Sequence, residues 1–386
     1  MPNYMRAPVA FERGEGAYLI GMDGRRYLDF AAGIAVTSLG HAHPHLVASL
    51  TSQAERLWHV FNLFEIPEQA GYAERLVSET FADSAMFCNS GSEAVEAAMK
   101  MARRYHFVNG QPERNRIITV EGAFHGRTFG ALAAANNVKY LEGYSPQLEG
   151  FDQVRFGDLN ELRGAIGPAT GAILVEPLQG ESGVRRLDGE YLRGLRSVAD
   201  EFGLLMILDE VQTGFGRTGK LFAHEWAGLV PDILAAAKGI AGGFPCGALL
   251  AVEKAAAAFT PSSHGSTFGG NPLAMAVANA VLDVLLTDGF LSGVTQTGEC
   301  LRSELETLAG RYPDVIAEVR GQGLLLGLKL TQVVPNTQFI QRARVMGLLM
   351  APAADNVVRI LPPLIIGIAE VEEGVAILER ACHGGV

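Results

Sequence analysis

The sequence GLLMILDEVQTGFGRTGKLFAHEWAGLVPDILAAAKGI, residues 203–240, decides the fold of this chain. It contains two short apolar runs, 204–208 and 233–237, which have the length of buried strands and are separated by a glycine-rich segment. Asp209 follows the first run and Lys238 follows the second. In a mainly parallel sheet, ligands bind beyond the carboxyl ends of the strands. The stretch therefore predicts an acid and an amine at the ligand-binding edge of one sheet.

These two side chains define a candidate chemistry. An ionised Asp209 after an apolar run is costly unless a cationic partner meets it, so we expect a cation there. Lys238 precedes a glycine-rich turn, and its amine is expected to emerge at a strand end. An acid directed at a ring nitrogen and an amine directed at an aldehyde are what pyridoxal 5′-phosphate (PLP) requires. The leading hypothesis is therefore a site with PLP as its cofactor.

The pattern of strand, turn and helix repeats on both sides of this stretch, from about residue 84 onward. Apolar runs that alternate with helical segments predict an α/β fold in which a mainly parallel sheet lies between helices. Asn89, Phe124 and Glu176 also stand at or just after the ends of apolar runs. One pocket is therefore expected to collect these residues together with the acid and the amine.

The two ends of the chain differ from its middle. Residues 14–30 predict short antiparallel strands with Asp23-Gly24 as a turn, and a helix is expected from Pro44. Asn271 and Pro272 predict the cap and the first position of a long helix. We therefore predict a large PLP-binding domain over 46–285 and a small α+β domain built from both chain ends, 1–45 and 286–386.

Composition limits the partners. The chain of 386 residues has 42 acidic and 31 basic residues, and this net charge of -11 supplies no field that would attract nucleic acid or an anionic membrane. The four cysteines are widely spaced, and the histidines of GHAHPHL (40–46) lack nearby carboxylates, so no metal is expected. No apolar leader or membrane-length run is present, and a reduced, cytoplasmic protein is predicted.

Two glycine-containing motifs leave alternatives open. In SGSEAVEAAMK, Ser90 and Glu93 have capping-box spacing, which indicates a helix start; Gly91 and Ser92 would then also present a phosphate site at the helix N-terminus. GFGRTGK (214–220) fits two nucleotide-binding patterns, but Leu221 stands where a P-loop needs Ser or Thr. A structural role is therefore expected for this turn.

Eight segments, in one order over nearly the whole chain, carry a family resemblance: GIAVTSLGHAHP, FCNSGSEAVEAAMKMARRY, FHGRT, EPLQGESGV, LDEVQTGFGRTGK, PDILAAAKGI, GSTFGGNPLA and VVRILPPL. Through them the chain resembles the class III (ornithine/acetylornithine-type) aminotransferases of PLP fold type I. The resemblance implies transfer of the ω-amino group of N2-acetylornithine to 2-oxoglutarate, a reaction of arginine biosynthesis, in a homodimer with shared active sites.

The resemblance also implies roles around the cofactor. Lys238 would bond to the PLP aldehyde and carry the proton, and Asp209 would keep the ring nitrogen protonated. The remaining cofactor-binding residues would be Gly91 and Ser92 at the phosphate, Phe124 and Val211 on the two ring faces, Gln212 at the phenolic oxygen, and Thr267 at the phosphate of the neighbouring subunit.

Five residues are implied in substrate binding. Arg127, with Tyr18 nearby, would hold the α-carboxylate of the amino donor. Arg359 would bind the α-carboxylate of 2-oxoglutarate, and Glu181 would pair with Arg359 when the ω-amino substrate is bound. Ser266, beside Thr267 in GSTFGGNP, is the fifth.

Several alternatives stay open at this point. Glu65, in the turn after NLF, departs from the neutral residue that relatives often have, and it makes a preference for an N-acylated donor less certain if it faces the pocket. Other donors within the family are succinyldiaminopimelate, ornithine and 4-aminobutyrate. Other classes are a PLP-fold protein that only binds or regulates, and a PLP-dependent aminomutase or decarboxylase.

Overall fold

A seven-stranded sheet forms the centre of the molecule in the computed structural model, which describes residues 1–383. Five adjacent strands run parallel, and β12 pairs antiparallel with both of its neighbours. The mainly parallel α/β sheet is thereby confirmed. In spatial order the strands are β4 (Ser84–Cys88), β12 (Gly247–Ala251), β11 (Ile233–Ala236), β10 (Leu205–Asp209), β7 (Thr170–Val175), β5 (Arg116–Val120) and β6 (Phe151–Val154).

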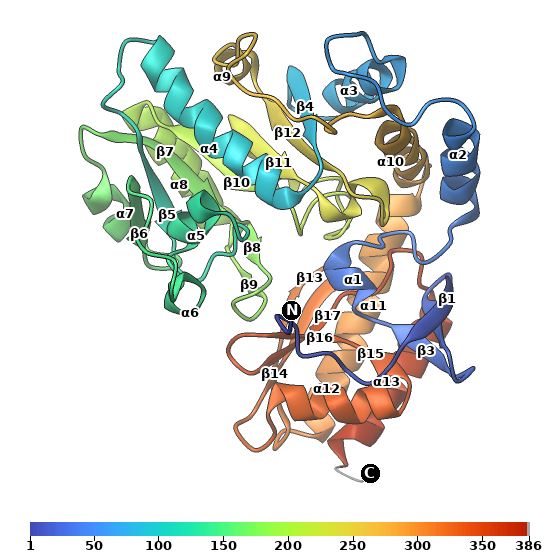
Figure 1. The fold of residues 1–386 in the computed structure, drawn as a ribbon. Helices are drawn as coiled ribbons and strands as arrows, with labels where there is room; N and C mark the ends of the chain where they lie inside the picture. Colours follow the sequence, from blue (N-terminus) through green and yellow to red (C-terminus); the bar gives the residue numbers. More distant parts are fainter. Residues whose placement is uncertain (384–386) are drawn as a thin grey trace.

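Helices cover both faces of this sheet (Figure 1). In β10, Leu205 and Ile207 pack in the core cluster that contains α4 (Gly91–Val108), whereas Met206 and Leu208 pack in the cluster on the other face with α8 (Gly189–Phe202). All these strand residues are buried. The continuous apolar run of the sequence thus reflects burial on both faces, as parallel sheets require.

The remaining elements of the middle part surround the sheet. The helix starts expected at Pro44 and Pro272 are confirmed, and the Asn271 side chain accepts from the Ala274 N–H at 2.9 Å. These elements are α2 (Pro44–Ala54), α3 (Pro67–Glu79), α5 (Phe129–Ala135), α6 (Val138–Leu141), α7 (Leu159–Ala165), β8 (Leu178–Gln179), β9 (Arg185–Arg186), η1 (Ala223–Ala227), η2 (Lys238–Ala241), α9 (Glu253–Ala256) and α10 (Pro272–Leu285).

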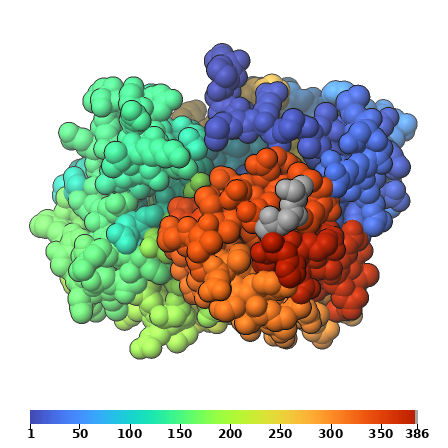
Figure 2. Space-filling view, turned by 90° about the horizontal axis from the view of Figure 1, so that it is seen from below, coloured from blue at the N-terminus to red at the C-terminus, as the bar shows by residue number. Residues whose placement is uncertain are grey.

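The two chain ends meet in a second body (Figures 1 and 2). β3 pairs in parallel with β15, Leu28 opposite Leu348, so the N-terminal hairpin and the C-terminal part share a sheet. This pairing fits the predicted small domain, whose boundaries stay a prediction. Its elements are β1 (Phe11–Glu15), β2 (Tyr18–Gly21), β3 (Arg26–Asp29), α1 (Ala32–Ala35), α11 (Phe290–Arg311), β13 (Ile316–Gln322), β14 (Leu325–Leu330), α12 (Asn336–Val345), β15 (Leu348–Leu349), β16 (Ala351–Ala353), β17 (Val357–Ile360) and α13 (Ile368–Cys382).

The glycine-rich turn 214–220 joins these two bodies. The backbone N–H of Leu324, between β13 and β14, donates to the Arg217 carbonyl at 3.1 Å. The buried Arg217 guanidinium donates in return to the carbonyls of Leu324 at 3.0 Å and Pro362 at 2.5 Å. The turn therefore holds the C-terminal sheet against the central sheet.

Within residues 1–383, no single helix has the length and hydropathy to cross a bilayer. The helices Pro272–Leu285 and Phe290–Arg311 meet those criteria only as a pair, which is bent by 71°.

Candidate active site

A cavity of about 640 Å³ opens at the carboxyl edge of the central sheet. It brings together the residues that follow β4, β5, β7, β10 and β11, as expected for a mainly parallel sheet. Its lining includes these predicted site residues: Gly91, Ser92, Phe124, Arg127, Glu181, Asp209, Val211, Gln212, Lys238 and Arg359. It also includes Asn89 and Glu176, so the expectation of one shared pocket is confirmed.

Lys238 is the first residue of η2, and its side chain lines this cavity. Burial lowers the pKa of Lys238 to about 8; Asp209 opposes this shift and Arg359 adds to it. Its backbone lies in the left-handed region, with φ at 46°, which costs roughly 1–2 kcal/mol for a residue with a side chain. A lysine that is partly neutral near physiological pH is a competent nucleophile and proton carrier.

Asp209 lies 4% exposed at the end of β10. Its carboxylate accepts from the backbone N–H of Val211 at 3.1 Å and contacts His125 Nδ1 at 2.8 Å. Among residues 1–383, no lysine or arginine nitrogen lies within 4 Å of the Asp209 carboxylate, and its side-chain partner is His125, which the sequence did not reveal. His125 stood in FHGRT between two residues with assigned roles, and no periodicity in that loop indicates where its ring points.

The N-terminus of α4 lies in the wall of the cavity, at the corner where a phosphate site is predicted. The Ser90 side chain caps the helix by accepting from the Glu93 N–H at 3.3 Å, and Gly91 and Ser92 line the cavity. A Cβ built at Gly91 would lie 2.6 Å from Val211 Cγ1, so a side chain at this position would fill the corner. An 18-residue helix presents free N–H groups and a positive dipole end to an anion here.

Two buried polar atoms of this site have no hydrogen-bond partner within residues 1–383. They are Gln212 Oε1 and His125 Nε2, and both residues line the cavity. Buried polar atoms are rarely left unsatisfied unless a ligand or water completes them. Together with the amine, the buried acid and the phosphate corner, these groups fit PLP. Lys238 would hold its aldehyde carbon, Asp209 its ring nitrogen, Gln212 its phenolic oxygen, and Gly91 and Ser92 its phosphate.

Two arginines line the cavity, and they differ in whether a carboxylate neutralises them. The Arg359 guanidinium is 3% exposed; it pairs with a Glu181 carboxylate oxygen at 3.0 Å and donates to the Pro352 carbonyl at 2.8 Å. The Arg127 guanidinium is exposed and lies 3.9 Å from the centre of the Tyr140 ring. Within residues 1–383, no carboxylate approaches Arg127 to within 4 Å. The site thus has one neutralised arginine and one that is open to an anion.

Glu176 lies buried in the lining of the same cavity. Its carboxylate accepts from the Phe124 N–H at 2.9 Å. Burial first and the nearby Asp209 second raise the pKa of Glu176 well above its usual range. Glu176 therefore positions the Phe124 backbone and is protonated more readily than an exposed carboxyl.

Four residues singled out in the sequence lie outside the cavity. The Tyr18 hydroxyl donates to Glu373 of α13 at 2.9 Å, so the ring beside Arg127 is that of Tyr140, and the placement of Tyr18 there is wrong. Ser266 and Thr267 line a separate hollow of about 510 Å³ with Phe61 and Asn62, and Glu65 is exposed. Thr267 therefore does not reach the phosphate corner of its own subunit.

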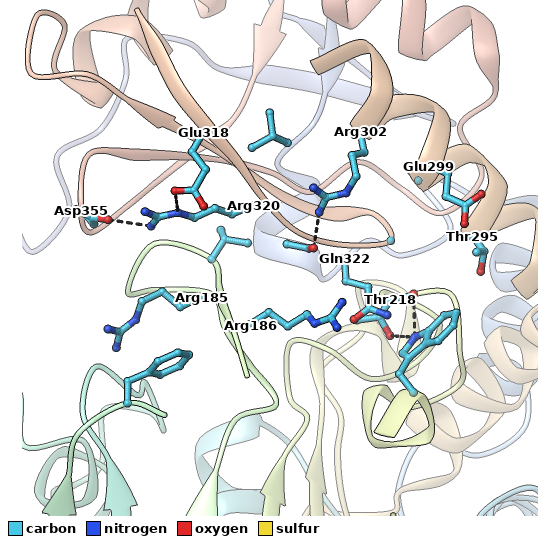
Figure 3. A pocket seen from close by; sticks show the side chains of 17 residues that line it. Arg185, Arg186, Thr218, Thr295, Glu299, Arg302, Glu318, Arg320, Gln322 and Asp355 are labelled. Atoms are coloured by element: carbon cyan, nitrogen blue, oxygen red, sulfur yellow. Dashed lines mark hydrogen bonds and ion pairs between the residues drawn. The ribbon is translucent and has the colours of Figure 1, made fainter. Parts of the chain in front are cut away.

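A second cavity, of about 800 Å³, lies between β9, α11 and β13 (Figure 3). Its arginines are largely satisfied: Arg320 contacts Glu318 at 2.7 Å and Asp355 at 2.8 Å, and Arg302 donates to the Gly321 carbonyl. The lining residues, all within the described chain, include no lysine, histidine or cysteine. This cavity lacks the amine that the first cavity offers.

Comparisons with known proteins agree with this geometry. The family "Aminotransferase class-III" matches residues 1–382. The acetylornithine aminotransferase of Brucella melitensis is 59% identical over 378 residues, 98% of this chain and 93% of that protein.

Two solved structures extend the agreement to the fold. The ornithine aminotransferase from Toxoplasma gondii, with PLP partially occupying its active site, superposes with a TM-score of 0.95 at 31% identity, covering 100% of this chain and 92% of that one. The acetylornithine aminotransferase from Elizabethkingia anophelis superposes with a TM-score of 0.89 at 32% identity, covering 100% and 96%. The chain has the type I fold of PLP enzymes, and it belongs to the class III aminotransferases, with pyridoxal 5′-phosphate as cofactor.

Proposed function

We propose that this aminotransferase transfers the ω-amino group of N2-acetyl-L-ornithine to 2-oxoglutarate, giving N-acetylglutamate 5-semialdehyde and L-glutamate, a step of arginine biosynthesis. The observation that carries the proposal is the Glu181–Arg359 pair, 3.0 Å apart, in the same cavity as the open Arg127. The names of the relatives from Brucella melitensis and Elizabethkingia anophelis support the same donor.

The arginine pair explains how one site accepts two substrates. N2-acetylornithine has one carboxylate, and Arg127 is the guanidinium free to bind it in the planar, bidentate manner typical of arginine. Glu181 meanwhile neutralises Arg359, which has no partner on this donor. 2-oxoglutarate has two carboxylates, and its α-carboxylate, beside the reacting carbonyl, replaces Glu181 on Arg359. Glu181 is therefore a removable substitute for the second carboxylate.

The other residues serve the chemistry at the reacting carbon. Bound PLP supplies an electron sink that stabilises negative charge on the substrate carbon. Lys238 gives and takes the proton at that carbon, since burial lowers the pKa of its amine to about 8. Asp209 would present its carboxylate to the ring nitrogen, and the N-terminus of α4 would hold the phosphate. Phe124 and Val211, which both line the cavity, would cover the two faces of the ring and keep water from them.

Half-reactions with single donors test the proposal. Each donor is mixed with the PLP form of the enzyme without 2-oxoglutarate, and the absorbance of the cofactor reports its conversion to the amine form. N2-acetylornithine should give the highest kcat/KM, followed by succinyldiaminopimelate, ornithine and 4-aminobutyrate. A higher kcat/KM for any of the other three donors would make that compound the donor in place of N2-acetylornithine. Release of product without formation of the amine form would show that the enzyme is not an aminotransferase.

Dimerisation and location are part of the same proposal. Leu57, Trp58, Phe61, Leu63, Phe64 and Phe268, named here the aromatic patch, are each 46–77% exposed. Asn62, within the patch, donates to the carbonyls of Ser266 at 3.1 Å and Gly269 at 3.0 Å, which places the patch beside Thr267. An apolar surface of this kind is typical of a subunit interface. We therefore infer a homodimer, with Thr267 directed at the phosphate of the neighbouring subunit, and a cytoplasmic enzyme.

A further inference from the structure

Tyr140 connects the two substrate-binding arginines. It lies on α6, and its hydroxyl donates to one Glu181 oxygen at 3.0 Å while Arg359 contacts the other Glu181 oxygen at 3.0 Å. The ring of Tyr140 contacts the other arginine, Arg127, whose guanidinium carbon lies 3.9 Å from the centre of that ring. A continuous chain of contacts therefore runs from Arg127 through Tyr140 and Glu181 to Arg359.

The Tyr140 ring also fixes the direction of Arg127. Within residues 1–383, the described contacts of the Arg127 guanidinium are with two rings, Tyr140 at 3.9 Å and Phe124 at 5.6 Å. These rings pack edge to face at 6.1 Å. A guanidinium over an aromatic face is attracted to the ring and loses side-chain freedom before the substrate arrives.

The hydroxyl of Tyr140 acts on the other arginine. It remains protonated at neutral pH, because burial and Glu181 both raise the pKa of Tyr140. The hydroxyl and Arg359 therefore hold one carboxylate between them. A second carboxylate on a substrate has to compete with Glu181 for Arg359. Any contact that stabilises Glu181 in this position disfavours dicarboxylates and leaves donors with one carboxylate unaffected or favoured.

We propose that Tyr140 is a positioning residue that sets the balance between the two substrate classes of the site, ω-amino donors with one carboxylate and five-carbon dicarboxylates. Its hydroxyl holds Glu181 on Arg359, and its ring holds Arg127 toward the cavity. The inference rests on the proposed function for the identity of the donor, but the competition between Glu181 and a dicarboxylate does not depend on that donor.

Binding of glutarate, a dicarboxylate that does not react, measures this competition. Calorimetric titration of the PLP form should show that Tyr140→Phe, which keeps the ring and removes the hydroxyl, binds glutarate about threefold to tenfold more tightly than wild type. Glu181→Gln should bind more tightly as well. The double variant should bind no more tightly than Glu181→Gln alone, because both changes act on one pair. Tyr144→Phe, on an exposed ring just after α6, is the control and should bind glutarate as wild type does.

The ring is tested separately from the hydroxyl. Tyr140→Leu removes both, and it should raise the KM for N2-acetylornithine above that of Tyr140→Phe, because Arg127 loses its stacked ring. Equal weakening of glutarate and donor binding in Tyr140→Phe would overturn the inference and assign the residue a purely structural role. Unchanged glutarate affinity would overturn it too. Failure of wild-type enzyme to react with N2-acetylornithine would overturn the proposed function alone, since the glutarate comparison would still stand.

Discussion

Lys238 is the residue on which the chemistry depends, and its buried position has a measurable consequence. With a pKa of about 8, the neutral fraction of the amine rises from about a tenth at pH 7 to about nine tenths at pH 9. Only the neutral amine attacks an aldehyde. The rate at which apoenzyme recombines with PLP, followed by absorbance, should therefore increase about tenfold between these pH values and then level off.

An unperturbed lysine would behave differently, because its pKa lies near 10.4. The recombination rate would then still climb about tenfold per pH unit at pH 9, and that result would show that burial does not shift Lys238. Lys238→Ala is the control: it lacks the amine, so it should bind PLP without the pH-dependent absorbance change and should have no turnover. Normal turnover in this variant would contradict the role of the residue.

At the scale of elements, the contact between the glycine-rich turn and the β13–β14 connection should control stability. Gly323 has φ of +58°, and an added Cβ would lie 2.6 Å from the Thr218 backbone. Gly228 has a similar φ of +65° and nothing within 4 Å of such a Cβ. Alanine at either position costs about 1 kcal/mol for the left-handed backbone. Gly323→Ala should cost roughly 2 kcal/mol more, because it separates the turn from the C-terminal sheet.

The midpoint of thermal unfolding of the two apoenzyme variants distinguishes these contributions. Gly323→Ala should lower Tm at least twice as far as Gly228→Ala. Equal decreases would mean that the backbone around residue 218 moves to admit the methyl group, and that the turn does not hold the two bodies together.

The elements that sequence predicts well are those whose signal is local. Short apolar runs predicted the strands that precede Asp209 and Lys238, and the structure has these strands. A capping residue and a proline predicted the helix starts at Ser90 and Pro272, which are also found. The parallel-sheet rule then placed the acid and the amine at one edge.

What the sequence could not predict depends on distant contacts. Tyr18 bonds to Glu373, which is 355 positions away, and no local pattern reveals which face of its strand meets α13. Tyr140 lies on a helix of four residues, too short to show a period, and its role follows only from Arg127 and Glu181 being brought to it. The β6 edge strand was missed as well, since its four residues FDQV show no continuous apolar run.

At the scale of the whole molecule, the aromatic patch predicts that the active site is complete only in a dimer. Leu63 is the most exposed of its members, at 77%, and the patch lies beside Thr267, which is outside the cavity of its own subunit. Leu63→Asp buries a charge in the inferred interface, which is unfavourable without a partner. It should give monomers in analytical ultracentrifugation and weaker PLP binding, because Thr267 no longer reaches the second subunit. Val333→Asp, at 74% exposure between β14 and α12, is the matched control and should remain dimeric. A Leu63→Asp dimer with unchanged PLP affinity would remove the aromatic patch from the interface, and a monomeric wild type with full activity would refute the shared site.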